Sequence, residues 1–353
     1  MKRAALALAA VLAAASASAQ APAPRVVNAS VEQRAVSGAL EAFFDALVNG
    51  QANPAWIAYS VPAVAGHHAG CCGSGESVVT GTPCYLEGRP SGAAVESRPV
   101  KLEGDRDLLV LFRVEARQVG RIALFSPECE LDAGGLRFFS LTGVQPADSV
   151  RMLSRLARAA GTADRVARTA VTALALHGDP SADAALQQLV APEQPMSVRT
   201  QAALWLGGVR GARGYQVLRE VVERDASPEF RRQATLGLSR SAEPGATDTL
   251  LRMAKADADA SVRGQALFWL AQKAGKQAIG AITDAIQNDP ESQVKERAVF
   301  ALSQLPKDEG VPLLITVARS NRDPKVRQRA MFWLGQSKDP RAVAFFEEIL
   351  KGK

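Results

Sequence analysis

A nine-residue motif recurs six times in this chain at an unbroken spacing of 32 residues, and no other feature restricts the fold as strongly. When the first motif residue is counted as offset 0, offset 4 is always Ala and offset 8 is always Leu. A fixed period of this length is typical of stacked supersecondary units that bury their apolar faces on one another. The motif therefore predicts an elongated array of repeats. The six copies are residues 166–174, 198–206, 230–238, 262–270, 294–302 and 326–334.

Each unit is predicted to consist of two helices joined by a turn. Offsets 0, 4, 7 and 8 are apolar in most copies, and at about 100° per residue they share one stripe of a helix. Apolar pairs at offsets 19–20 and 23–24 indicate a second helix, and Gly or Pro residues separate the two in most units. Six such units make residues 162–353 an all-α solenoid.

The motif also resembles a known family. The patterns at 198–207, 262–270 and 326–335, each with Val and Arg followed by the fixed Ala and Leu, resemble HEAT repeats. They are most similar to the short bacterial kind that also occurs in phycobilisome lyases. This resemblance implies an α-solenoid with a scaffolding or docking role, whereas no residue pattern here indicates a bilin site or lyase activity. The recurrent cation at offset 1 resembles the structural ladder of that family (Arg199, Arg231, Arg263, Lys295 and Arg327).

Offset 6 departs from the expected polar character. It lies on the side of the first helix away from the core stripe, and five of the six copies carry an apolar residue there. With helices about 8–10 Å apart, these residues would form a ridge on the order of 40 Å long. The ridge either packs on neighbouring helices or on the N-terminal domain folding back, or it docks another protein or a second copy. Its residues are Leu204, Leu236, Phe268, Phe300 and Phe332.

Three tryptophans at offset 7 lie beside this ridge, at the edge of the core stripe. Such residues are either core residues or binding hot spots for a partner. They are Trp205, Trp269 and Trp333.

The N-terminus is predicted to be a cleaved signal peptide, residues 1–19. Two cations at residues 2–3 precede an Ala/Leu/Val run at 4–15, and small residues at 17–19 form a cleavage site before Gln20. The apolar run is too short to span a bilayer, so the chain is not expected to be an integral membrane protein. We therefore expect a periplasmic or secreted protein, with residues 20–30 as an extended linker.

A small α+β domain is predicted at residues 31–148. The pattern favours a helix at 31–48, a strand at 55–61, a hairpin of 107–115 with 119–126, and a strand at 136–143, all antiparallel. A helix within residues 149–161 would cap the first repeat and connect it to this domain.

Four cysteines lie in the N-terminal half, and an even number in an exported chain indicates disulfides. Three pairings are open: we favour Cys72–Cys84 with Cys71–Cys129, and disfavour a strained Cys71–Cys72 bond. The alternative is a metal-binding or enzymatic site that combines these cysteines with His67 and His68, although the spacing matches no standard zinc pattern. The remaining histidine, His177, is expected to be solvated in a turn.

Charge divides the chain in two. Residues 20–149 hold 10 Lys or Arg against 14 Asp or Glu, and residues 150–353 hold 30 against 22. Export and the absence of basic runs longer than two residues argue against nucleic acid. The basic half is explained either by solvated helix faces or by an acidic partner surface. The sequence therefore predicts a non-catalytic scaffold without metal or cofactor that binds a protein of unknown identity. Self-association through the ridge is the alternative.

Overall fold

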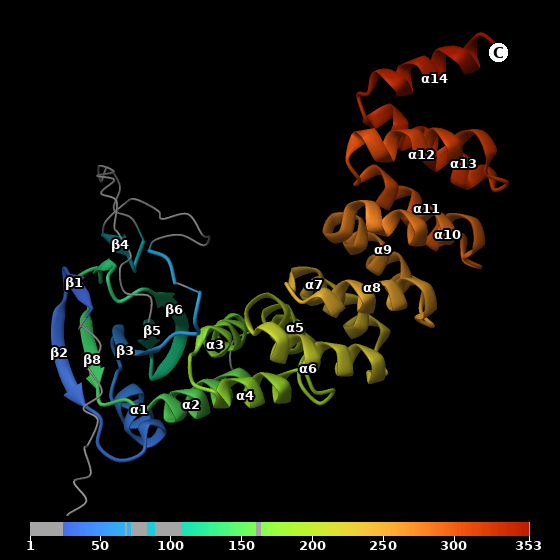
Figure 1. Ribbon diagram of the computed structural model, residues 1–353. Helices are drawn as coiled ribbons and strands as arrows, with labels where there is room; N and C mark the ends of the chain where they lie inside the picture. Colours follow the sequence, from blue (N-terminus) through green and yellow to red (C-terminus); the bar gives the residue numbers. More distant parts are fainter. Residues whose placement is uncertain (1–23, 68, 72–82, 89–106, 160–163, 353) are drawn as a thin grey trace, which may run out of the picture.

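The computed structural model describes residues 24–67, 69–71, 83–88, 107–159 and 164–352. It shows a mixed α/β region, here called the head, followed by a curved row of paired helices (Figure 1). No helix within these ranges is long and apolar enough to cross a membrane.

The head is built on a five-stranded mixed sheet in the order β2-β8-β3-β5-β6. Strands β2, β8 and β3 are parallel to one another, and β3, β5 and β6 are antiparallel. A smaller parallel sheet has the order β1-β7-β4. The strands are β1 (Arg25–Val27), β2 (Ser30–Ala35), β3 (Ala55–Pro62), β4 (Cys84–Tyr85), β5 (Asp107–Glu115), β6 (Gln118–Phe125), β7 (Glu130–Asp132) and β8 (Arg137–Thr142).

Both faces of the large sheet are covered, so its central strand β3 is apolar on both sides. Ile57 and Tyr59 point into the core shared with helices, and Trp56 and Ala58 point into a second core beneath the small sheet. This alternation follows from the two-residue period of a strand. On the helical side, helix α1 (Leu40–Asn49) packs an aromatic side chain, Phe44, edge-on against the sheet.

The head differs from expectation in its first elements. The strand at 55–61, the hairpin and the strand at 136–143 are confirmed. The helix predicted at 31–48 is wrong in its first part, because residues 30–35 form β2 and pair with β8. The segment expected to be a linker includes β1, and the sheet is mixed because α1 carries the chain across to a parallel position.

The second half consists of six helix pairs, as predicted. The first helices are α3 (Asp164–Leu176), α5 (Met196–Val209), α7 (Pro228–Arg240), α9 (Ala260–Ala274), α11 (Ser292–Ser303) and α13 (Pro324–Gln336). The second helices are α4 (Ser181–Leu189), α6 (Gly211–Arg224), α8 (Pro244–Ala256), α10 (Ile279–Asn288), α12 (Lys307–Ser320) and α14 (Pro340–Leu350). A short 3-10 helix, Gly275–Ala278, precedes α10.

The repeat motif forms the continuous core of this solenoid. Every residue at offsets 0, 4 and 8 is at most 2% exposed. The first helices contact one another in a row, α3 to α5 to α7 and onward, and most also pack on the second helix of the same unit. Stacking therefore buries the apolar stripe that a single helix pair would leave exposed to solvent.

Small residues lie where the backbones of neighbouring helices approach most closely. Gly207 and Gly237 lie where α5 crosses α7, and a Cβ at Gly207 would come within 1.9 Å of the Gly237 carbonyl oxygen. At offset 16, where a second helix meets the end of the first, every unit has Gly or Ala; Gly214 and Gly310 are examples, each facing a Leu carbonyl. These contacts fix the spacing between helices.

Helix α2 (Pro146–Arg158) joins the head to the solenoid, packing on α1 and β3 as well as on α3 and α4. The Tyr59 and Ser149 hydroxyls are hydrogen-bonded at 3.0 Å in the buried junction. The backbone adds two bonds, from Val64 N–H to the Leu176 carbonyl and from Gly178 N–H to the Pro62 carbonyl. One apolar core therefore runs from the head through the row of helices.

His177 lies in the turn between α3 and α4 as predicted, but the expectation that it is solvated is wrong. The end of β3 crosses this turn, and Ala63 forms a β-bridge with His177. The side chain is 0% exposed, its Nδ1 accepts a hydrogen bond from Asp179 N–H at 3.1 Å, and its Nε2 has no partner. Burial lowers the pKa of His177 to about 4, so the imidazole is neutral at physiological pH.

Candidate functional site

The five ridge residues occupy equivalent positions on successive first helices, from α5 to α13. Leu204, Leu236, Phe268 and Phe300 are partly exposed, and Phe332 is 50% exposed. The head packs on α2 and α3, at the opposite end of the row from α13 (Figure 1), the helix that contains Phe332. The ridge therefore packs along its own row and stays partly open to solvent.

The aromatic members of the ridge are stacked on one another. The rings of Phe268 and Phe300 lie 5.5 Å apart and nearly parallel, and Phe300 lies 4.8 Å from Trp333. Trp269 contacts Phe268 and Trp333 contacts Phe332, both in edge-to-face geometry. We call these five side chains the aromatic strip; it spans three consecutive repeats.

The three tryptophans sit at the edge of the core, partly buried and packed against it. Trp205 Nε1–H donates to the Thr172 hydroxyl at 3.1 Å. Trp333 Nε1 is buried and has no hydrogen-bond partner. A buried donor without a partner is destabilising; Trp205 meets the Thr172 hydroxyl, whereas Trp333 meets the Phe300 ring at the equivalent position.

Trp333 lines a pocket of about 350 Å³ between α11, α12 and α13. The residues that form it were not identified from the sequence, apart from Trp333 itself. Its floor is apolar, and two lysines, Lys307 and Lys338, lie among its lining residues. The sequence signal that was missed is a 64-residue spacing of the tryptophans, each followed by a cation four or five positions later.

The cations at offset 1 have a structural role. Arg231 binds both carboxylate oxygens of Asp257 at 2.8 and 2.7 Å, and this bond raises the pKa of Arg231. The same guanidinium also donates to the backbone carbonyl of Asp225, in the preceding unit. Each arginine thus fastens two units together, and we call this the arginine ladder. Its other members are Arg199 with Asp225 and Arg263 with Asp289.

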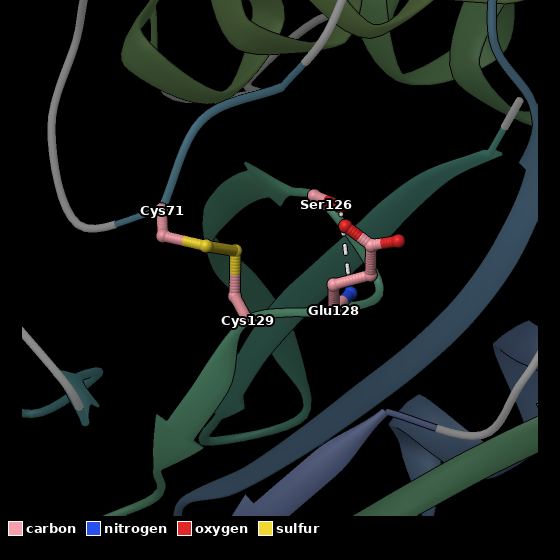
Figure 2. Close-up of a disulfide and its surroundings, with 4 residues drawn as sticks. All are labelled: Cys71, Ser126, Glu128 and Cys129. Atoms are coloured by element: carbon pink, nitrogen blue, oxygen red, sulfur yellow. Dashed lines mark hydrogen bonds between the residues drawn. A yellow bond between two sulfur atoms is a disulfide. The ribbon is translucent and has the colours of Figure 1, made fainter. Parts of the chain in front are cut away.

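The favoured Cys71–Cys129 bond is present, with Cα atoms 5.5 Å apart (Figure 2). It ties the segment after β3 to the loop before β7, where Glu128 N–H donates to the Ser126 hydroxyl. Cys84 is also disulfide-bonded. Cys72 and His68 lie outside the described residues, so the Cys72–Cys84 pairing stays a prediction.

These disulfides bear on the alternative of a metal or nucleophile site. Zinc and covalent catalysis both need a thiolate, and a disulfide sulfur cannot supply one. Cys71 and Cys84 are therefore unsuited to either role. His67 is partly exposed and its Nδ1 lies 3.4 Å from the Ala65 carbonyl.

Comparison with known proteins identifies the repeats. The family model for HEAT repeats matches residues 193–271 and 279–353. No curated protein matches the chain.

Three solved structures illustrate the similarity of part of this chain to other proteins. Human deoxyhypusine hydroxylase has 18% identity over 57% of this chain and 89% of its own, with a TM-score of 0.31. The CpcE–CpcF complex of phycocyanin lyase from Nostoc has 22% identity over 44% and 98%, with a TM-score of 0.34. The Cnd3–Cnd2 subcomplex of S. pombe condensin has 20% identity over 54% and 28%, with a TM-score of 0.35.

Proposed function

Since residues 193–271 and 279–353 of this chain are HEAT repeats, we propose that the protein is an exported, non-catalytic scaffold that binds another protein through its solenoid. Solenoids present long surfaces whose side chains are held in a fixed register by the stack. The site proposed here is the ridge, from Leu204 to Phe332, together with the three tryptophans beside it.

The observation that carries this proposal is the aromatic strip. Trp and Tyr side chains dominate binding energy at interfaces, and each aromatic ring offers on the order of 150–250 Å² of contact area. In the strip the rings are already stacked, for example Phe268 on Phe300. Ordering them on binding therefore costs little conformational entropy, which favours affinity.

Charge supports one class of partner. Residues 150–353 carry 30 Lys or Arg against 22 Asp or Glu, a net charge of +8. Complementary charge raises the association rate and selects among partners more than it adds affinity. An acidic protein surface suits this solenoid.

Export is supported by the signal-peptide pattern at residues 1–19 and by the Cys71–Cys129 disulfide, since such bonds persist in oxidising compartments. Fractionation of expressing cells, with mass spectrometry of the recovered protein, tests this part. A chain that begins at Gln20 in the periplasmic or secreted fraction agrees with it, and an intact N-terminus in the cytoplasmic fraction contradicts it.

Capture of partners from a periplasmic extract tests the binding surface. The test protein carries Leu236→Ser, Phe268→Ser and Phe300→Ser. A matched control carries three exposed substitutions on the second helices, Arg219→Ser, Lys255→Ser and Gln287→Ser. We expect partners to bind the native protein and the control but not the ridge variant, with all three showing the same helical circular dichroism. Equal capture by the ridge variant would eliminate the ridge as the docking surface.

Self-association is separated by sedimentation velocity. Phe268→Asp with Phe332→Asp changes the oligomeric state only if copies of the chain meet through the ridge. A sedimentation coefficient that is identical for the native protein and this variant removes self-assembly through the ridge and leaves a different protein as the partner.

A further inference from the structure

Strand β2 is an open edge of the large sheet in the head. The sheet order places β2 at one edge and β6 at the other. The β6 edge contacts helix α3 of the solenoid, whereas β2 lies on the side of the head away from the solenoid (Figure 1). Within the described residues no element pairs with the outer side of β2, and five of its six residues are exposed. Such an edge can bind another strand through its backbone.

Alternate residues of β2 direct their backbone groups to this outer side. The Ser30 N–H donates to the Leu136 carbonyl, and the Val36 N–H donates to the Thr142 carbonyl. In this parallel register the even-numbered residues of β2 therefore bond to β8. The odd-numbered residues present an N–H and a C=O outward, in the plane of the sheet. They are Val31, Gln33 and Ala35.

The side chains between these residues carry opposite charges. Glu32 and Arg34 lie on the same face of β2, and their side chains are joined at 2.6 Å. On either side of Gln33 the strand thus has first a charged residue, negative before and positive after, and then an apolar one. A second copy of the strand, running antiparallel with Gln33 opposite Gln33, would meet each charge with its opposite.

The charges also favour this register over its neighbours. Outward-facing residues must lie opposite outward-facing residues in an antiparallel pair, so the register changes in steps of two residues. With Gln33 opposite Gln33, Glu32 of each copy lies opposite Arg34 of the other, with Cα atoms about 4.5 Å apart. One step in either direction places Glu32 opposite Glu32 or Arg34 opposite Arg34, and like charges that are directly opposite are destabilising.

We propose that two copies of this chain pair through β2, antiparallel and with Gln33 opposite Gln33, so that their large sheets form one continuous sheet. The contact is isologous, and it closes after two copies because each contributes the same edge. It also places Ala35 of the second copy beside Val31, which is 51% exposed in one copy. This inference goes beyond the proposed function, because the solenoid surface takes no part in it.

Sedimentation velocity of the mature protein at increasing concentration measures the pairing. One strand pair is a small interface, so we expect a dimer with a dissociation constant of roughly 1–100 µM. Glu32→Arg and Arg34→Glu should each weaken the dimer at least ten-fold, because each places like charges opposite one another twice. A protein with both substitutions should dimerise as the native protein does, since opposite charges again face each other. Arg117→Glu, an exposed charge reversal in the turn between β5 and β6, is the matched control and should leave the dimer unchanged.

A mixture of the two single variants tests the register directly. The Glu32→Arg variant carries two positive charges on this face of β2, and the Arg34→Glu variant carries two negative charges. Neither pairs well with itself, but in the proposed register each charge of one variant lies opposite the other sign in the second. We expect the equimolar mixture to form a dimer of native strength, observed by labelling one variant with a fluorophore.

A backbone substitution separates strand pairing from charge attraction. Gln33→Pro removes the central outward N–H, and proline is tolerated in an edge strand where that group faces solvent. This variant should remain monomeric with an unchanged circular dichroism spectrum. Gln33→Thr keeps the N–H and suits a strand, so it is the matched control and should still dimerise.

Four results would overturn the proposal. They are a native protein that stays monomeric up to about 300 µM, single charge variants that dimerise as strongly as the native protein, a mixture of them that stays monomeric, and a Gln33→Pro variant with native dimer strength. The ridge variant with Leu236, Phe268 and Phe300 changed to Ser should still dimerise. Loss of the dimer with ridge-dependent capture intact would leave the proposed function standing.

Discussion

The same substitution at one repeat position should stabilise one unit and destabilise another. Gly207 in α5 and Gly335 in α13 both lie at offset 9. A Cβ at Gly335 has no atom within 4 Å, whereas a Cβ at Gly207 would lie 1.9 Å from the carbonyl oxygen of Gly237 in α7. The obstacle is backbone, so it cannot move aside by a side-chain rotation.

The magnitudes follow from two opposing effects. Ala is favoured over Gly in a helix by about 0.8–1 kcal/mol, and this is the main effect at Gly335, reduced somewhat because the helix ends at Gln336. At Gly207 the same gain is offset by overpacking, which costs about 1–3 kcal/mol and more when backbones must separate. Separation also loosens the contact of Gly237 with Ala203, whose carbonyl lies 2.3 Å from the Cβ position of Gly237. We expect Gly335→Ala to gain about 0.5 kcal/mol and Gly207→Ala to lose about 2 kcal/mol.

Thermal unfolding followed by circular dichroism at 222 nm measures both variants beside the native protein. For a unit of this size, about 1 kcal/mol corresponds to roughly 2–4 °C. The two variants should therefore differ by roughly 5–10 °C, with Gly335→Ala the more stable. If Gly207→Ala unfolds at or above the native temperature, α5 and α7 do not approach as closely as described, and the reasoning from close backbone contact fails.

Two further predictions concern buried charge and titration. Arg231→Met leaves the Asp257 carboxylate, which is 7% exposed, without its partner and should lower the free energy of unfolding by about 3 kcal/mol in urea titrations at pH 7. His177, whose pKa falls from 6.5 to about 4 on folding, should make stability decrease as pH falls from about 6.5 to 4, by up to about 3 kcal/mol in total, because the unfolded chain binds the proton more tightly.

Each of these two predictions has a control variant. Lys295 occupies the same offset as Arg231, but Asn321 replaces the aspartate that would face it, so Lys295→Met should cost less than about 1 kcal/mol. If both variants lost the same free energy of unfolding, the arginine ladder would not be what joins the units. For the titration, His177→Gln should flatten the pH dependence between 4 and 6.5, and an unchanged slope would assign it to other groups.

The solenoid could be predicted from the sequence because its signal is repeated. Val262, Ala266 and Leu270 on one helix are weak indicators alone, yet the same three positions recur at a fixed spacing in every unit and are buried in every unit. The second helices were predicted in the same way, from apolar pairs at offsets 19–20 and 23–24 that recur with the same period. The protein-binding surface was inferred from the same register, through the apolar residues at offset 6.

The head contains no such repeats, and the wrong prediction in it has a cause that lies far away in the sequence. Residues 31–35 were assigned to a helix because Val36 and Leu40 share its apolar face. The chain instead places this segment beside β8, and that pairing is set by a strand about 100 residues away. Short strands are decided by such distant partners, and the strand's own sequence does not reveal them.

The burial of His177 and the pocket beside Trp333 were missed for a similar reason. A turn such as the one containing His177 is normally exposed, but here Pro62 and Ala63 of the head cover it. The pocket lies between three helices, and one residue that lines it, Lys338, has a left-handed backbone that its residue type does not predict. The burial of His177 arises where the first repeat meets the head, and the pocket arises between two repeats.

The distribution of the arginine ladder bears on how the binding surface works. The ladder ends at Arg263 and Asp289, because Lys295 follows and Asn321 takes the next aspartate position. Phe332, the most exposed member of the ridge, lies beyond this end. Units that are joined by fewer buried ion pairs open locally at lower free energy. Leu204 and Leu236 therefore lie on helices that buried ion pairs join, whereas Phe300 and Phe332 lie on helices beyond the last of these pairs, and we expect the ridge to open locally more readily beyond the break.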